Sequence, residues 1–227
     1  MATTASPAGR PAVADSKALA WLTAWIRSHK QATAYAAVAL ALAGGLYGWT
    51  LLTARTAERS AGREIEQGRL ALDSKNYPLA ASVLSRVVEN YSGTHAAQEG
   101  MLLLAQVRLA QGQSAQAIEL LERYAPTADH DFRAQAYGLL GAACENVARP
   151  KDAATAYETA AAVAPYPFLR AQYLSDAGRA WVAAGDTAKA IAAYRTIAER
   201  LDSTNVAAEA KVRLGELTKG AGIGGLK

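Results

Sequence analysis

The sequence has few of the residues on which catalytic and metal sites depend. It contains one cysteine, Cys144, and three histidines, His29, His95 and His130, among 227 residues. A single cysteine excludes an internal disulfide and gives no information about the redox compartment. None of the strong metal-ligand spacings is present, and no glycine-rich phosphate loop follows a strand pattern. We therefore expect no enzyme activity, no catalytic residues, no metal, no cofactor and no small-molecule substrate.

Two isolated candidates have simple structural interpretations. Asp129, His130 and Asp131 are adjacent acidic and imidazole groups, but they fall in a loop, and we interpret them as solvated rather than as metal ligands. Cys144 falls on the inward side of an expected helix, where we interpret it as a packed thiol. Neither candidate changes the expectation of a non-catalytic protein.

Aromatic residues are also scarce, and neither acidic nor basic residues are in large excess. Aromatics make up 7% of the chain, whereas hydrophobic residues make up 51% and alanine dominates them. This composition favours closely packed helices, so we predict an all-α fold. The formal net charge is +4, but acidic and basic residues alternate through the chain, and we predict no nucleic-acid binding.

Only one long apolar run is present, over residues 31–54 (QATAYAAVALALAGGLYGWTLLTA), and it carries no charge. A helix needs about 20 mostly apolar residues to cross a bilayer, so the run predicts a single transmembrane helix. The alternative is a cleaved signal peptide, whose apolar region has about 7–15 residues close to the N-terminus. This run is longer and starts later, which favours an uncleaved anchor with the lipid bilayer as a partner.

The residues before the run divide into two segments. Residues 1–14 are rich in Ala, Thr and Pro and are expected to be disordered. Residues 15–30 have apolar residues at helical spacing and predict an amphipathic interfacial helix; the alternative is a plain N-terminal extension of the transmembrane helix. Aromatic and basic residues near both ends of the span are expected to anchor it at the membrane surface: Trp21, Trp25, Arg27, Lys30, Tyr47 and Trp49.

Small residues recur within the apolar run at intervals of four. Such residues allow a second helix to approach closely, either from another copy of the chain or from another membrane subunit. The residues expected at this helix–helix contact are Ala37, Ala41, Gly44, Gly45 and Gly48.

A pattern of about 36 residues repeats four times after the apolar run, a period that is typical of solenoid proteins. We predict one repeat domain over 55–219, with repeats near 61–94, 98–131, 134–167 and 171–204, a capping helix over 205–219 and a flexible tail over 220–227. We call the first helix of each repeat helix A and the second helix B. Each helix A carries a small residue (Gly68, Ala105, Gly141, Gly178), and each helix B carries a large one (Leu84, Leu121, Tyr157, Tyr194).

This pattern resembles the tetratricopeptide repeat (TPR). Small residues let two helices approach, the large residue fills the gap between them, and a Gly, Pro or Asn turn separates the helices. The resemblance implies a domain that binds other proteins through its concave face, which helix A lines. Projecting the repeat pattern places the following candidate partner-binding residues on that face: Arg69, Asp73, Gln106, Gln135, Glu145, Asn146, Gln172, Ser175 and Arg179.

The order of the parts resembles that of a bacterial family, the ancillary subunits of the Sec translocon. The residues that carry this resemblance are a Trp-containing stretch (AWLTAWIRSHK), the span ending in GGLYGW and the repeat domain after it. The resemblance implies a single-pass protein of the bacterial inner membrane with a cytoplasmic N-terminus and a periplasmic repeat domain. Basic residues flank the span almost equally, so charge alone leaves the orientation open.

Two functions follow as hypotheses. The first is a membrane-anchored interaction module that handles or scaffolds client proteins at the cell envelope, beside the Sec translocon. The second is a structural accessory subunit of a large bacterial membrane complex, such as a photosynthetic or respiratory one, held by its transmembrane helix. A handover protein should bind many peptides weakly, whereas a structural subunit should copurify with one complex at fixed stoichiometry.

Overall fold

The computed structural model describes residues 21, 25 and 27–219, and the chain divides into two units, Met1–Arg55 and Thr56–Lys227. The expected tails 1–14 and 220–227, and most of the expected interfacial helix 15–30, lie outside the described residues. Every regular element in the described part of the chain is an α-helix. The all-α prediction is therefore confirmed.

In the first unit, helix α2 (Lys30–Asp73) contains the apolar run and continues into the second unit. By length and composition it is able to cross a membrane, and none of its most apolar window is buried among the residues that the structure describes. The leucine side chains of the run are exposed, as in Leu40 (73%) and Leu46 (68%). Trp25, one of the expected interface anchors, is also exposed and stacks on His29 with 5.0 Å between the ring centroids.

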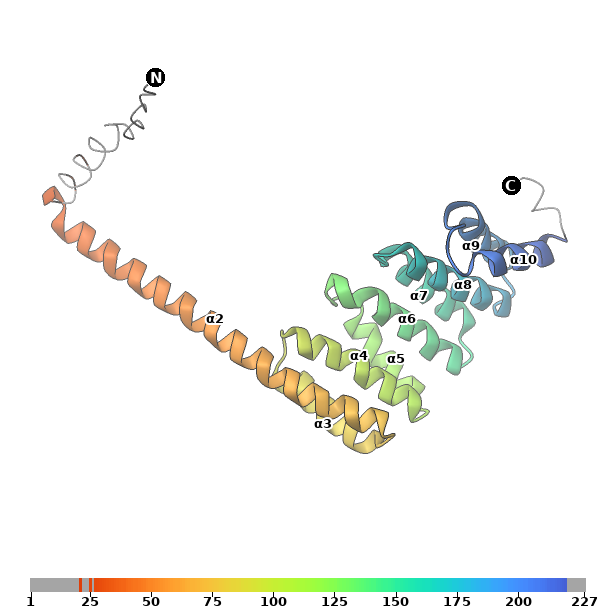
Figure 1. The fold of residues 1–227 in the computed structure, drawn as a ribbon, viewed down its shortest axis with the longest axis horizontal. Helices are drawn as coiled ribbons and strands as arrows, with labels where there is room; N and C mark the ends of the chain where they lie inside the picture. The colour runs from red at the N-terminus through yellow and green to blue at the C-terminus, as the bar shows by residue number, and fades with distance from the viewer. Residues whose placement is uncertain (1–20, 22–24, 26, 220–227) are drawn as a thin grey trace, which may run out of the picture. The chain divides into compact units, whose positions relative to one another are not determined.

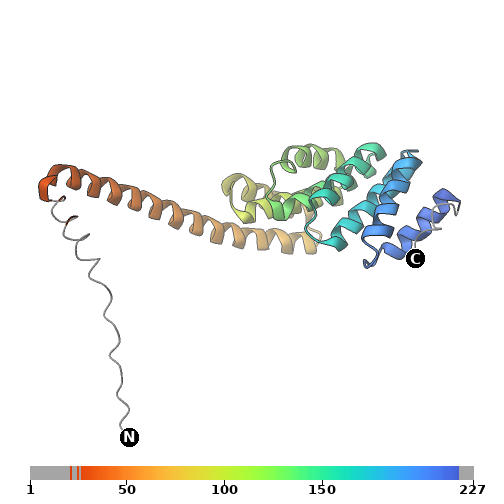
Figure 2. The same ribbon diagram turned by 90° about the horizontal axis from the view of Figure 1, so that it is seen from above.

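The second unit consists of helices that follow one another as antiparallel pairs, from yellow to blue along the chain in Figure 1 and from a second side in Figure 2. The part of α2 after residue 55 pairs with α3, α4 pairs with α5, α6 with α7 and α8 with α9, while α10 packs on α9. The helix bounds are α3 Tyr77–Asn90, α4 His95–Ala110, α5 Ser114–Tyr124, α6 His130–Asn146, α7 Pro150–Val163, α8 Pro167–Ala183, α9 Thr187–Arg200 and α10 Ala207–Thr218.

The pairs are held together where the small residue of helix A meets the large residue of helix B. A Cβ atom added to Gly141 would lie 2.6 Å from Cε1 of Tyr157, and one added to Gly178 would lie 2.7 Å from Cζ of Tyr194. The same contact in the first pair joins Gly68 to a leucine, with 2.6 Å to its Cδ2 atom. These distances leave no space for a side chain, so the small residues set how closely the helices approach.

The N-terminal end of the repeat unit is fixed by two carboxylates of α2. Glu58 accepts hydrogen bonds from the backbone N–H groups of His95 and Ala96, both at 3.0 Å, and so satisfies donors at the start of α4. Glu64 pairs with Arg86 of α3 at 3.1 Å and accepts a hydrogen bond from the Tyr91 hydroxyl at 3.0 Å. The packed unit therefore includes α2 from Glu58 onward.

All four turns between helix A and helix B use one residue with positive φ. These residues are Lys75 (φ 59°), Gly112 (73°), Ala148 (55°) and Gly185 (79°). The second and fourth repeats place glycine there, for which this conformation has no steric cost, whereas the first and third repeats accept a strained residue.

Replacing Ala148 with glycine is expected to stabilise the domain. Relief of the left-handed strain is worth about 1–2 kcal/mol, and the extra backbone entropy of glycine in the unfolded chain offsets about half of it. The expected gain is about 0.5–1 kcal/mol in the free energy of unfolding, measured by urea denaturation with circular dichroism. The matched control, Gly112→Ala, should lose stability; a loss in Ala148→Gly as well would contradict this account.

A candidate protein-binding face

The nine residues that the sequence places on the concave face all lie in helix A of a repeat, but they do not form one cluster. Arg69 of α2 forms an ion pair with Glu99 of α4, the next helix A. Arg69 is therefore paired at the first two repeats, whereas Arg179 lies in the fourth repeat, so these two basic residues do not form one cluster. Most of the others are exposed along the A helices: Asp73 on α2, Gln135 and Asn146 on α6 and Gln172 on α8, with Gln106 on α4 and Ser175 on α8 half-buried.

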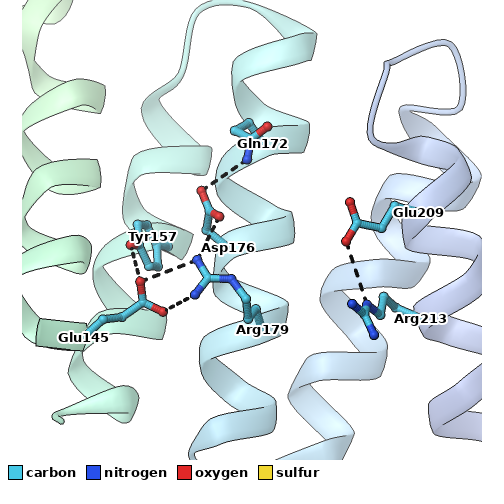
Figure 3. A network of polar contacts seen from close by, with 7 residues as sticks. All are labelled: Glu145, Tyr157, Gln172, Asp176, Arg179, Glu209 and Arg213. Atoms are coloured by element: carbon cyan, nitrogen blue, oxygen red, sulfur yellow. Dashed lines mark hydrogen bonds and ion pairs between the residues drawn. The ribbon is translucent and has the colours of Figure 1, made fainter.

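The structure brings together one group of these residues, shown in Figure 3. Arg179 of α8 contacts Glu145 of α6, with 2.6 Å between Nη1 and Oε1. Its other nitrogen, Nη2, lies 3.1 Å from Oδ1 of Asp176, one turn earlier on α8. Tyr157 of α7 donates a hydrogen bond to Glu145 at 2.8 Å, and Gln172 donates one to Asp176 at 3.5 Å. The network therefore joins the A helices of the third and fourth repeats.

Burial and pairing shift the pKa values in this network. Burial and the hydrogen bond to Glu145 raise the pKa of the Tyr157 hydroxyl well above its ordinary value. Burial lowers the pKa of Arg179, but the hydrogen bond to Asp176 and the charge of Glu145 outweigh it and raise the pKa overall. Arg179 is therefore a permanent cation held between two carboxylates, and Tyr157 stays neutral. This arrangement holds one positive charge between two carboxylates.

A cleft of about 340 Å³ lies beside this network, between α8 and α10. On the α10 side, Arg213 lies 3.8 Å from a carboxylate oxygen of Glu209 and 3.1 Å from one of Glu216. The hydrogen bond to Glu216 raises the pKa of Arg213. The residues lining the cleft are Gln172, Ser175, Asp176, Arg179, Val182, Tyr194, Glu209, Arg213, Glu216 and Leu217.

Three of the nine predicted residues line this cleft, namely Gln172, Ser175 and Arg179, and Glu145 contacts the last of them. The α10 residues were not predicted, because the sequence interpretation treated this helix only as a cap. Their signal is present in the sequence: Glu209, Arg213 and Glu216 occur at intervals of four and three, which places them on one side of a helix.

The other candidates remain separate from this face. Cys144 is 2% exposed, and burial raises the pKa of its thiol, which keeps it protonated and unreactive. His130 and Asp131 lie 3.5 Å apart and are both exposed. The expected loop is wrong here, because α6 begins at His130 and Asp129 is its N-cap residue. No group of three or more potential metal ligands occurs among the residues that the structure describes. In the apolar run, Gly44, Gly45 and Gly48 have open space around them, and Ala41 is exposed; the side chain of Ala37 lies outside the described part.

A comparison with known protein families gives a match over part of the repeat domain. Residues 60–167 match the tetratricopeptide repeat-like domain family. No curated protein sequence matches the chain.

Solved structures share the fold at low sequence identity. One is a crystal structure of a variant of nearly identical TPR-like repeats from Podosopora anserina, ascribed to a kinesin light chain. It has 19% identity and a TM-score of 0.57, and the match covers 73% of this chain and 88% of that chain. A second crystal structure of these repeats gives 18% identity with the same TM-score and coverage. The MamA protein has 22% identity and a TM-score of 0.55, and the match covers 72% of this chain and 83% of that one. At these identities the likeness establishes the TPR-like solenoid fold alone.

Proposed function

We propose that this chain, whose residues 60–167 match the tetratricopeptide repeat-like domain family, is a membrane-anchored module that binds other proteins. Repeat solenoids present an extended concave surface for such binding, and the fold is typically non-catalytic. The observation that carries the proposal is the cleft on the A-helix side of the last repeat, lined by polar residues of α8 and α10. The apolar part of α2 supplies the anchor.

The proposals for where the chain is anchored and what it does at the membrane depend on features of the sequence. The uncharged run over 31–54 supports insertion in a bilayer, and the order of parts supports a place beside the Sec translocon of a bacterial inner membrane, with the repeat domain in the periplasm. There the domain would hold emerging or client proteins on its A-helix face.

Site-specific photocrosslinking in native membranes tests this proposal. A photoreactive amino acid replaces Gln135 or Gln172, which are exposed on A helices, or, as the matched control, Thr155, which is exposed on helix B of the third repeat. We expect protein adducts from the two A-helix positions and few or none from Thr155. Equal labelling at all three positions, or none at any of them, would contradict binding through the A-helix face.

The alternative, a structural accessory subunit of a large membrane complex, has its own support in the apolar run. A Cβ atom added to Gly44, Gly45 or Gly48 would meet nothing within 4 Å outside its own stretch of helix, which leaves room for another transmembrane helix to approach. Gentle detergent extraction separates the two functions. A single set of copurifying subunits at fixed stoichiometry indicates the accessory subunit, and many weakly bound chains indicate a client-handling protein.

A further inference from the structure

We propose that the cleft between α8 and α10 accepts a lysine or arginine side chain of an extended peptide and rejects acidic segments. This inference rests on the proposed function, because it names the chemistry of the partner that the A-helix face binds.

The arginines of the cleft are already neutralised. Arg179 lies between Glu145 and Asp176, at 2.6 Å and 3.1 Å from their oxygens. Arg213 lies between Glu209 and Glu216, at 3.8 Å and 3.1 Å. There are thus two carboxylates for each guanidinium group, so these side chains of the cleft and its edge carry net negative charge. Figure 3 shows three of the four contacts, namely those of Arg179 with Glu145 and Asp176 and that of Arg213 with Glu209. Both arginines among the described lining residues are already paired, so they attract a ligand carboxylate only weakly, whereas an ammonium or guanidinium group complements this field.

The cleft also has an apolar wall that suits the stem of a long basic side chain. Val182 is 46% exposed on α8, Leu217 of α10 is partly buried, and the ring of Tyr194 also lines the cleft. Lysine and arginine bury their methylene groups along such surfaces and keep the charged end near water and carboxylates. A volume of about 340 Å³ is at the lower end for ligand pockets and fits one long side chain better than a folded surface.

Polar groups next to the wall can bind the peptide backbone. Gln172 and Ser175 line the same cleft from α8, and an amide and a hydroxyl both donate and accept hydrogen bonds. Glu209 and Glu216 are exposed, with 62% and 57% of their side-chain surface accessible, so each attracts a cation only weakly. The expected binding is therefore weak and sensitive to salt.

The test measures binding of fluorescent extended peptides to the full chain in detergent micelles. Three peptides share one sequence and differ only at the central residues, which are lysine, glutamine or glutamate. We expect the lysine peptide to bind tightest and its affinity to fall as salt rises. The variant Glu209→Gln/Glu216→Gln should weaken the lysine peptide about fivefold, with little change for the glutamine peptide.

The matched control is Glu119→Gln/Glu122→Gln on α5. Glu119 also forms an exposed pair with an arginine four residues later, and both carboxylates lie on a helix B. This control removes the same charge from the domain and should leave the lysine peptide unaffected. Thermal unfolding of both double variants checks that they are folded, and each single variant, Glu209→Gln and Glu216→Gln, gives an independent measure of part of the loss.

The outcomes separate this inference from the proposed function. Tighter binding of the glutamate peptide, equal binding of all three, or an equal loss in the α5 control would overturn the charge preference of the cleft. In these cases the crosslinks from Gln135 and Gln172 still support the A-helix face as a binding surface. Absence of both peptide binding and crosslinks would contradict the proposed function as well.

Discussion

Replacing Gly141 with alanine is expected to destabilise the repeat domain, although alanine is the better helix former. The new methyl group would lie 2.6–2.8 Å from three ring atoms of Tyr157. That ring is 5% exposed and its hydroxyl is bonded to Glu145 at 2.8 Å, so the ring cannot move aside without losing packing and a hydrogen bond. Overpacking of this kind costs about 1–3 kcal/mol, against a gain of about 1 kcal/mol in helix propensity. We expect a net loss of up to about 2 kcal/mol and a lower midpoint in thermal unfolding.

The chain supplies both the control and the compensating change. A Cβ atom added to Gly62 of α2 would meet nothing within 4 Å outside its own stretch of helix, so Gly62→Ala should gain helix propensity and raise the unfolding midpoint. The second repeat already combines alanine with leucine, in Ala105 and Leu121, which are both fully buried. The double variant Gly141→Ala/Tyr157→Leu recreates that pair, and it should recover part of the loss that the single change causes. A higher midpoint for Gly141→Ala alone would show that the small residue does not set the spacing of the helices.

The contact between a small residue on helix A and a large residue on helix B explains why the fold was predictable from the sequence. A small residue on helix A and a large residue on helix B recur at one period, and the physical requirement that they meet holds in every repeat. The turns were less predictable, because Lys75 and Ala148 adopt the left-handed conformation without being glycine. Their positions follow only from equivalence with Gly112 and Gly185. The helix A starts at His95, His130 and Pro167 lie a few residues before the repeat starts expected at 98, 134 and 171.

The proposed binding face was less predictable from the sequence than the fold. Periodicity assigns a residue to helix A, and Gln172, Ser175 and Arg179 do line one cleft. It does not show which carboxylate an arginine meets, since the Arg179–Glu145 contact joins residues on successive A helices. Periodicity also does not show that Arg69 pairs with Glu99, at the other end of the domain from Arg179. Long-range ion pairs depend on how the repeats stack, which a one-dimensional pattern does not contain.

Charging the apolar run is expected to release the protein from the membrane. Leu42 and Leu46 are 69% and 68% exposed, one turn apart, and the apolar window around them is not buried within the described part of the chain. The proposed membrane anchor would place such a row of apolar side chains in the hydrocarbon core of a lipid bilayer. Arginine at the centre of an inserted helix costs about 2.5–3.5 kcal/mol per residue. The variant Leu42→Arg/Leu46→Arg should therefore move from carbonate-washed membranes to the supernatant.

The matched control places the same substitutions outside the run. Leu70 of α2 and Leu79 of α3 are exposed at 61% and 50%, and Leu70→Arg/Leu79→Arg should leave the chain in the membrane fraction.

The mass of the membrane-bound protein distinguishes an anchor from a signal peptide, because an anchor retains residues 31–54 and a cleaved signal removes them. An unmodified chain that is washed into the supernatant at full mass would contradict the anchor. We would then expect a protein partner to cover the exposed leucines of α2. The accessory-subunit hypothesis predicts such a partner for part of the same helix.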